Sequence, residues 1–138
     1  MEYLRVFVAA AGSVIAEYLG VFDGMLHALV VFVIVDYISG ILRAATEQKL
    51  SSNIGAKGIA KKIAIFVLVG VANVVDVHVI GTEHLTRSAV IAFYLTNEGI
   101  SIIENMAGMG LPIPTKLVEI LAQIDGKNRQ SGESRGPK

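Results

Sequence analysis

The sequence predicts an all-α integral membrane protein with three to four short transmembrane helices, a C-terminal amphipathic helix and a homo-oligomeric assembly. Hydrophobic residues make up 53% of the 138 residues and charged residues only 17%. The mean hydropathy is +0.60, and ordinary soluble domains are less apolar. A chain of this size holds one domain. Because the helices are short, we expect a sizeable core to be shared between copies.

The apolar residues are gathered in four segments, at about 6–22, 25–44, 62–80 and 88–107. A helix of about 18 residues rises about 27 Å, close to the roughly 30 Å of a hydrocarbon core. The second and third segments predict transmembrane helices. The fourth, the most polar, predicts a further one, and the first either spans the membrane or lies on it. Only Phe22-Asp23-Gly24 separates the first two segments, which predicts a tight hairpin.

The distribution of lysine and arginine predicts the orientation. The connection at 43–62 carries Arg43 and the lysines at 49, 57, 61 and 62, whereas the connection at 81–87 carries one arginine. Excess Lys/Arg marks the cytoplasmic side, so we expect the Lys-rich connection and the C-terminus there. The N-terminus is cytoplasmic if the first segment spans and external if it lies flat.

A fifth helix is predicted after the break at Gly110-Leu111-Pro112. Residues 113–125 place apolar side chains at helical spacing opposite polar ones, as in an amphipathic helix at the membrane interface or against another subunit. Residues 126–138 contain no large apolar residue, which predicts a disordered polar tail. The membrane domain is therefore expected to cover residues 1–125.

Several polar residues lie inside the apolar segments. Lipid does not solvate such groups, so each must face another helix, another subunit or water. In the fourth segment they share one side of the helix at 100° per residue. We expect a pore lining or an oligomer interface to include Asp36, Asn73, Asp76, Glu98, Ser101 and Asn105.

Other roles are open for some of these residues. Asp36 and Arg43 lie two turns apart and would neutralise each other at the cytoplasmic end of a helix. Asn73 suits an interhelical hydrogen bond, and Asp76 suits the outer interface. In the first segment, the ridge formed by Gly12, Ala16 and Gly20 predicts close helix packing.

The sequence argues against several classes of function. It contains no cysteine, and its three histidines have no metal-ligand spacing. No nucleophile–base set or phosphate-binding loop is present. The formal net charge is zero, which gives no indication of a nucleic-acid partner. We therefore expect no enzyme, no metal and no cofactor.

Five strings occur in order: DYISG (36–40), LSSNIGAKGIAKKI (50–63), ANVVD (72–76), NEGISIIEN (97–105) and GLPIPTKL (110–117). Their order and spacing resemble the phage-lysis and toxin-secretion holins, which include the clostridial toxin-export holins. The resemblance covers roughly residues 1–124.

The resemblance implies a protein that oligomerises in the bacterial cytoplasmic membrane and forms large lesions there. These lesions release an endolysin or an exported toxin. The released protein is a functional partner that the holin need not contact directly. The direct partners are then other copies and membrane lipids. Two alternatives remain: a small oligomeric ion channel or transporter, and an antiholin-like regulator that does not conduct. Met25 is a candidate internal start for a shorter form.

Overall fold

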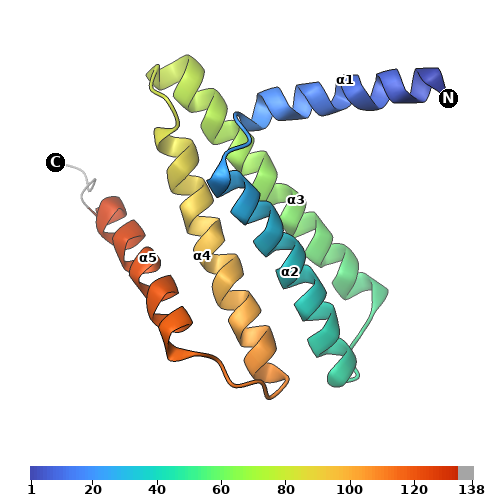
Figure 1. The fold of residues 1–138 in the computed structure, drawn as a ribbon, viewed down its shortest axis with the longest axis vertical. Coiled ribbons are helices and arrows are strands. Elements are labelled where there is room, and N and C mark those ends of the chain that lie inside the picture. Colours follow the sequence, from blue (N-terminus) through green and yellow to red (C-terminus); the bar gives the residue numbers. More distant parts are fainter. Residues whose placement is uncertain (134–138) are drawn as a thin grey trace.

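The computed structural model describes residues 1–133, with side chains for all of these except residues 125 and 127–133. This part of the chain is helical and contains no strand (Figure 1). Its elements are α1 (Glu2–Leu19), α2 (Gly24–Thr46), α3 (Ser52–Val74), the π-helical η1 (Val75–Ile80), α4 (Leu85–Gly108) and α5 (Thr115–Glu133).

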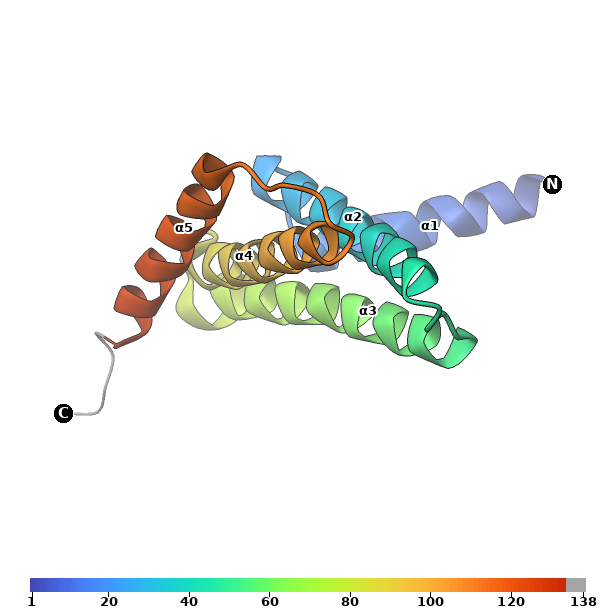
Figure 2. The same cartoon turned by 90° about the horizontal axis from the view of Figure 1, so that it is seen from below.

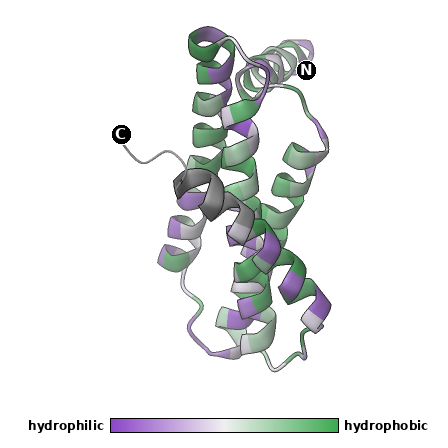
Figure 3. Ribbon diagram, turned by 90° about the vertical axis from the view of Figure 1, so that its left-hand side faces the viewer, coloured by the Kyte–Doolittle hydropathy of each residue, from purple (hydrophilic) through white to green (hydrophobic). Residues whose placement is uncertain are grey.

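Helices α2, α3 and α4 lie side by side as a bundle, and α5 packs on α4 (Figures 1 and 2). The core between the three bundle helices consists of Leu26, Leu29, Val33, Ile65, Val69 and Ile91. Many other large apolar residues point outward, among them Ile34, Ile63 and Val67. Figure 3 shows hydrophobic residues along most of the length of the bundle helices. Such an extensive exposed apolar surface is typical of a protein that faces lipid.

Two helices of the described chain are long and apolar enough to cross a membrane, judged by length and composition. They are Gly24–Thr46, and Ser52–Ile80, in which η1 continues α3. These are the second and third predicted segments. Helices α1 and α4 do not meet the same criterion, so the structure supports two candidate spans and leaves the further spans as predictions.

The start of α3 corrects the prediction of a polar connection up to Lys62. The helix begins at Ser52, because the Ser51 hydroxyl accepts a hydrogen bond from the Ile54 N–H at 3.2 Å and caps its N-terminus. Lys57, Lys61 and Lys62 therefore lie on a helix. This places the Lys62 side chain inside the bundle.

The position of α1 corrects the predicted hairpin. Among the described residues α1 contacts α3 and not α2, and it contributes no buried residue. It projects sideways from the bundle (Figures 1 and 2). Gly20 turns the chain with a φ of 84°, a conformation that glycine adopts readily. Asp23 then caps α2 by accepting a hydrogen bond from the Leu26 N–H at 2.9 Å. The short linker thus redirects the chain instead of pairing the two helices.

The last helix also differs from its prediction. Helix α5 continues to Glu133, beyond residue 125, where we expect the amphipathic helix to end. Leu121 is buried beside Gly99 of α4, so α5 packs on a helix of its own chain. For residues 134–138, the predicted disordered tail lies outside the described residues.

The contact between α1 and α3 depends on a glycine. The Tyr18 ring lies where a Cβ on Gly70 would be, and its hydroxyl donates a hydrogen bond to the Val67 carbonyl at 2.7 Å. We expect Gly70→Ala to lower the free energy of unfolding by about 1–3 kcal/mol, because the added methyl displaces the ring. Thermal unfolding in detergent measures this change.

The matched control is Gly12→Ala, since a Cβ at Gly12 would meet nothing within 4 Å. This variant is expected to be neutral or more stable by up to about 1 kcal/mol, because alanine favours a helix over glycine. Equal destabilisation by the two variants would contradict the role of Gly70.

Candidate functional site

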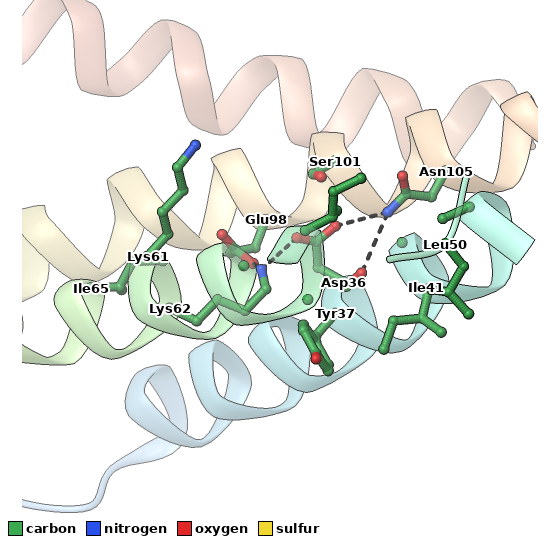
Figure 4. A pocket seen from close by; sticks show the side chains of 15 residues that line it. Asp36, Tyr37, Ile41, Leu50, Lys61, Lys62, Ile65, Glu98, Ser101 and Asn105 are labelled. Atoms are coloured by element: carbon green, nitrogen blue, oxygen red, sulfur yellow. Dashed lines mark hydrogen bonds and ion pairs between the residues drawn. The ribbon is translucent and has the colours of Figure 1, made fainter. Parts of the chain in front are cut away.

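A cluster of charged side chains lies in the middle of the bundle (Figure 4). Asp36 is roughly halfway along α2, about 15–18 Å from each end of that helix at 1.5 Å per residue. If α2, a candidate membrane span, crosses the bilayer, this carboxylate lies near mid-membrane depth. Charged groups at that depth are costly and mark functional sites by default.

Lys62 joins carboxylates from two other helices. Its Nζ lies 2.6 Å from Asp36 Oδ2 of α2 and 2.7 Å from Glu98 Oε2 of α4. The side chains are 15% exposed for Lys62 and 11% for each carboxylate. We call these three residues the charge cluster. It ties α2, α3 and α4 together and holds one more negative than positive group when all three are ionised.

Polar neighbours complete the surroundings of Asp36. The Asn105 amide donates to Asp36 Oδ1 at 3.1 Å and to Ser39 Oγ at 3.0 Å. The Ser39 hydroxyl in turn donates to the Asp36 carbonyl at 3.0 Å. Each carboxylate oxygen of Asp36 therefore has a partner, as buried polar groups require.

A cavity of about 350 Å³ adjoins the charge cluster. It is lined by the charge cluster together with Ser101 and Asn105, and it extends to Leu50 and Ile54 near the start of α3 (Figure 4). The bundle thus has a space with both polar and apolar lining next to its buried charges, on the side of the Lys-rich connection.

A second polar cluster lies at the opposite end of the bundle. Arg87 of α4 is fully buried and donates to the carbonyls of Leu19 at 2.8 Å and Val21 at 2.6 Å, and to Asp23 Oδ2 at 2.9 Å. Buried Asp76 accepts hydrogen bonds from the N–H groups of Thr86, at 2.9 Å, and Arg87, at 2.8 Å. Asp76 thereby satisfies free N–H groups at the start of α4.

Asn73 completes this end of the bundle. Its amide donates to the carbonyls of Tyr18 at 3.2 Å and Glu17 at 3.5 Å. A Cβ on Gly20 would lie 2.6 Å from Asn73 Oδ1, so glycine permits this close approach. We call Asn73, Asp76, Arg87 and Asp23 the junction cluster, because it joins the α1–α2 linker to α3, η1 and α4.

The structure thus divides the predicted site residues into two groups. Asp36, Glu98, Ser101 and Asn105 come together at mid-bundle, whereas Asn73 and Asp76 lie in the junction cluster. In the predicted ridge, Gly12 and Ala16 are exposed and only Gly20 makes a close approach within the chain. Ridge packing between copies therefore stays a prediction.

The pairing of Asp36 with Arg43 is wrong for this fold. Arg43 Nε instead lies 3.0 Å from Glu47 Oε1. The partner of Asp36 is Lys62, which is not among the predicted site residues, because the sequence predicts a polar connection before it. The helix-capping Ser51 and the absence of proline between 51 and 62 are the signals for a helix that starts ten residues before Lys62, instead of at Lys62 as the predicted segment does. Arg87 is likewise not among the predicted site residues, because the sequence predicts it in the connection at 81–87.

Asp23, which lies just outside α2, makes the junction cluster sensitive to acid. Burial raises the pKa of its carboxyl, but hydrogen bonds from the Leu26 N–H and Arg87 and the Arg87 charge outweigh this and hold the pKa below its ordinary value. A depressed pKa in the folded state stabilises the fold above the unfolded pKa. This stabilisation is lost as the pH falls through 3.8 and below.

We therefore expect wild-type protein to unfold at a higher temperature than Asp23→Asn at neutral pH, and the difference to shrink as the pH falls below about 4. Asparagine keeps an oxygen for the Leu26 N–H, so the variant removes mainly the charge. Thermal unfolding in detergent across a pH series measures this difference. A difference that stays constant with pH would contradict the role of the Asp23 charge.

No group of three or more His, Asp or Glu side chains able to hold a metal ion occurs in the part of the chain that the structure describes. The charge cluster is occupied by its own lysine. Its chemistry is that of ion pairing inside the bundle, which responds to hydration and to helix separation.

Comparison with known proteins identifies the family. The sequence profile of the bacteriophage holin family matches residues 13–126. The chain belongs to the bacteriophage holin family. This confirms the resemblance seen in the sequence strings. Holins are membrane proteins and not enzymes, which agrees with the two candidate spans. No solved structure matches the chain.

Relatives of this holin-family protein occur in bacteria and in a phage. An uncharacterized protein of Listeria innocua is 42% identical over 94% of this chain and 92% of its own length. An uncharacterized 14.9 kDa protein of Clostridium perfringens is 36% identical over 92% and 96%, respectively. A probable holin of Bacillus phage phi105 is 33% identical over 78% and 79%.

Proposed function

We propose that this holin-family protein oligomerises in the bacterial cytoplasmic membrane and forms large lesions that release an endolysin or an exported toxin. Its Lys-rich connection and C-terminus face the cytoplasm, as lysine and arginine excess favours. The observation that carries the proposal is the charge cluster, buried halfway along apolar helices in a chain of this family.

The charge cluster explains why a single copy is tolerated in lipid. Lys62 is paired with both carboxylates, and Asn105 and Ser39 satisfy the rest of Asp36. The outward faces of α2 and of the part of α3 that follows Lys61 carry large apolar side chains. A closed monomer therefore presents little charge to the hydrocarbon, and copies accumulate without opening the membrane.

Separation of α2, α3 and α4 would expose the same groups. Unpaired charges are tolerated at membrane depth only where they face water or another polar surface. A group of opened copies satisfies this condition by turning the polar faces toward a common water-filled lumen. We assign the lumen or the seam between copies to Asp36, Glu98, Ser101 and Asn105, while Asn73 and Asp76 keep the junction cluster intact.

The test is inducible expression in bacteria that also hold an endolysin and a folded cytoplasmic reporter protein. Membrane potential and reporter release are followed together. We expect abrupt depolarisation with release of the folded reporter. Depolarisation without release would instead identify a small channel or transporter, and the absence of both at normal membrane levels of the protein would identify a non-conducting regulator.

A further inference from the structure

We propose that α1 lies flat in the membrane interface at the end of the bundle opposite the Lys-rich connection. One apolar stripe of α1 is immersed in lipid, and its polar face points to water. The inference goes beyond lesion formation and requires only that the bundle spans the membrane.

The sequence of α1 separates into two faces. At 100° per residue, the large apolar side chains fall within an arc of about 160°, while the charged and hydroxyl side chains share an opposite arc of about 120°. Val6 is the one large apolar residue outside the apolar arc. The polar face carries Glu2, Arg5, Ser13 and Glu17. The apolar stripe consists of Tyr3, Leu4, Phe7, Val8, Val14, Ile15, Tyr18 and Leu19.

The last two members of the stripe show which way it faces. Tyr18 packs against Gly70 of α3 and Leu19 packs against the bundle core. The same stripe continues toward the N-terminus, past the edge of the bundle, where Phe7 and Ile15 are exposed. Helix α1 runs across the direction of α2 and α3 (Figures 1 and 2). If those two helices cross the membrane, α1 runs along it with the stripe toward the lipid beside the bundle.

The junction cluster fixes this direction. Asn73 and Arg87 donate to main-chain carbonyls at the end of α1 and in the linker, those of Glu17, Tyr18, Leu19 and Val21. Carbonyls at the end of a helix have no partner within it. Turning α1 to run alongside α2 would break these partly buried hydrogen bonds, which is costly.

The chemistry of the stripe fits lipid better than a second copy. Close helix pairing in membranes favours small residues, and of the four alanines and one glycine of α1 only Ala11 falls within the stripe. The stripe instead offers aromatic and branched side chains, with Tyr3 and Tyr18 near its two ends, and tyrosine is enriched at membrane interfaces. Glu2, Arg5 and Glu17 give no basic excess, so apolar burial and not headgroup charge holds the helix.

The absence of cysteine allows a direct test with single-cysteine variants of the full chain. Ser13→Cys probes the polar face and Ile15→Cys the stripe, at nearly the same position along α1. Spheroplasts are treated with a membrane-impermeant maleimide before lysis begins. We expect Ser13→Cys to be labelled and Ile15→Cys to be protected, with both labelled in detergent.

Lys57→Cys, exposed near the start of α3, is the control for the other side. It should be labelled in inverted vesicles and not in intact spheroplasts, which also shows that no lesion has opened. Protection of both α1 positions in spheroplasts and inverted vesicles would overturn the proposal in favour of a spanning helix. Labelling of both in spheroplasts would indicate a helix in water, and labelling of Ser13→Cys only in inverted vesicles would place α1 on the cytoplasmic side; each overturns it.

Oxidation tests whether a second copy of the chain, instead of lipid, covers the stripe. Disulfide-linked dimers of Ile15→Cys, without dimers of Ser13→Cys, would show a second copy on the stripe and overturn the lipid assignment. Monomers of both variants support it. All of these readouts precede lysis, so a failure of the proposed lesion function would leave them interpretable.

Discussion

Lys62→Met is expected to destabilise the protein by about 3 kcal/mol, because it leaves two buried carboxylates without their cation. Asp36 and Glu98 each have a side chain only 11% exposed, and both depend on the same Nζ atom. Methionine keeps the length and the apolar stem of lysine, so the loss of charge is the main change. Thermal unfolding in detergent and the amount of protein in the membrane fraction measure the effect.

The neighbouring lysine supplies the control. Lys61 is exposed, and it makes no ion pair with any side chain that the structure describes. Lys61→Met is therefore expected to change stability by less than about 1 kcal/mol. Combining Lys62→Met with Asp36→Asn and Glu98→Gln should recover part of the loss, because the variant then contains no unpaired charge. Equal effects of the two lysine substitutions would refute the importance of the charge cluster.

Arg87→Met is expected to have the second large effect, again about 3 kcal/mol. The guanidinium is fully buried and donates hydrogen bonds to the carbonyls of Leu19 and Val21 and to the Asp23 carboxylate. Its removal takes one hydrogen-bond donor from each of the two carbonyls and removes the cation that pairs with Asp23. We expect a lower unfolding temperature together with faster proteolysis in the α1–α2 linker, since the linker loses its attachment to α4.

Arg43→Met is the matched control for Arg87→Met, because Arg43 is a less buried arginine. Arg43 is paired with Glu47, and its side chain is 37% exposed. An ion pair of this kind contributes at most about 1 kcal/mol, and the linker should keep its wild-type resistance to protease. If both arginine variants lost stability equally, or if the linker of Arg87→Met stayed protected, the junction cluster would not be what holds α1 in place.

The charge cluster and the junction cluster have different structural roles. The charge cluster closes the bundle at its centre, and the junction cluster sets the direction of α1 at one end. The proposed opening of the bundle breaks the first and leaves the second intact. A variant that weakens only the charge cluster is therefore expected to change lesion timing without changing the labelling of α1.

The sequence by itself determined the helical class, the two candidate spans and the family. The spans follow from continuous apolar runs at 25–44 and 62–80, and hydropathy is a local property that a sequence carries in full. The sequence also identifies the polar residues inside the apolar segments as candidate site residues, because polar groups are costly in lipid.

Only the tertiary structure decided which groups meet. Sequence spacing within one helix suggested Arg43 as the partner of Asp36, whereas the fold supplies Lys62 from another helix. Likewise, a three-residue linker predicted a hairpin, yet Gly20 and the hydrogen bonds of Arg87 send α1 sideways. Periodicity shows which face of a helix is polar, but not the height or the angle at which a second helix crosses it. Partner choice depends on both, so it emerges only when the helices are packed.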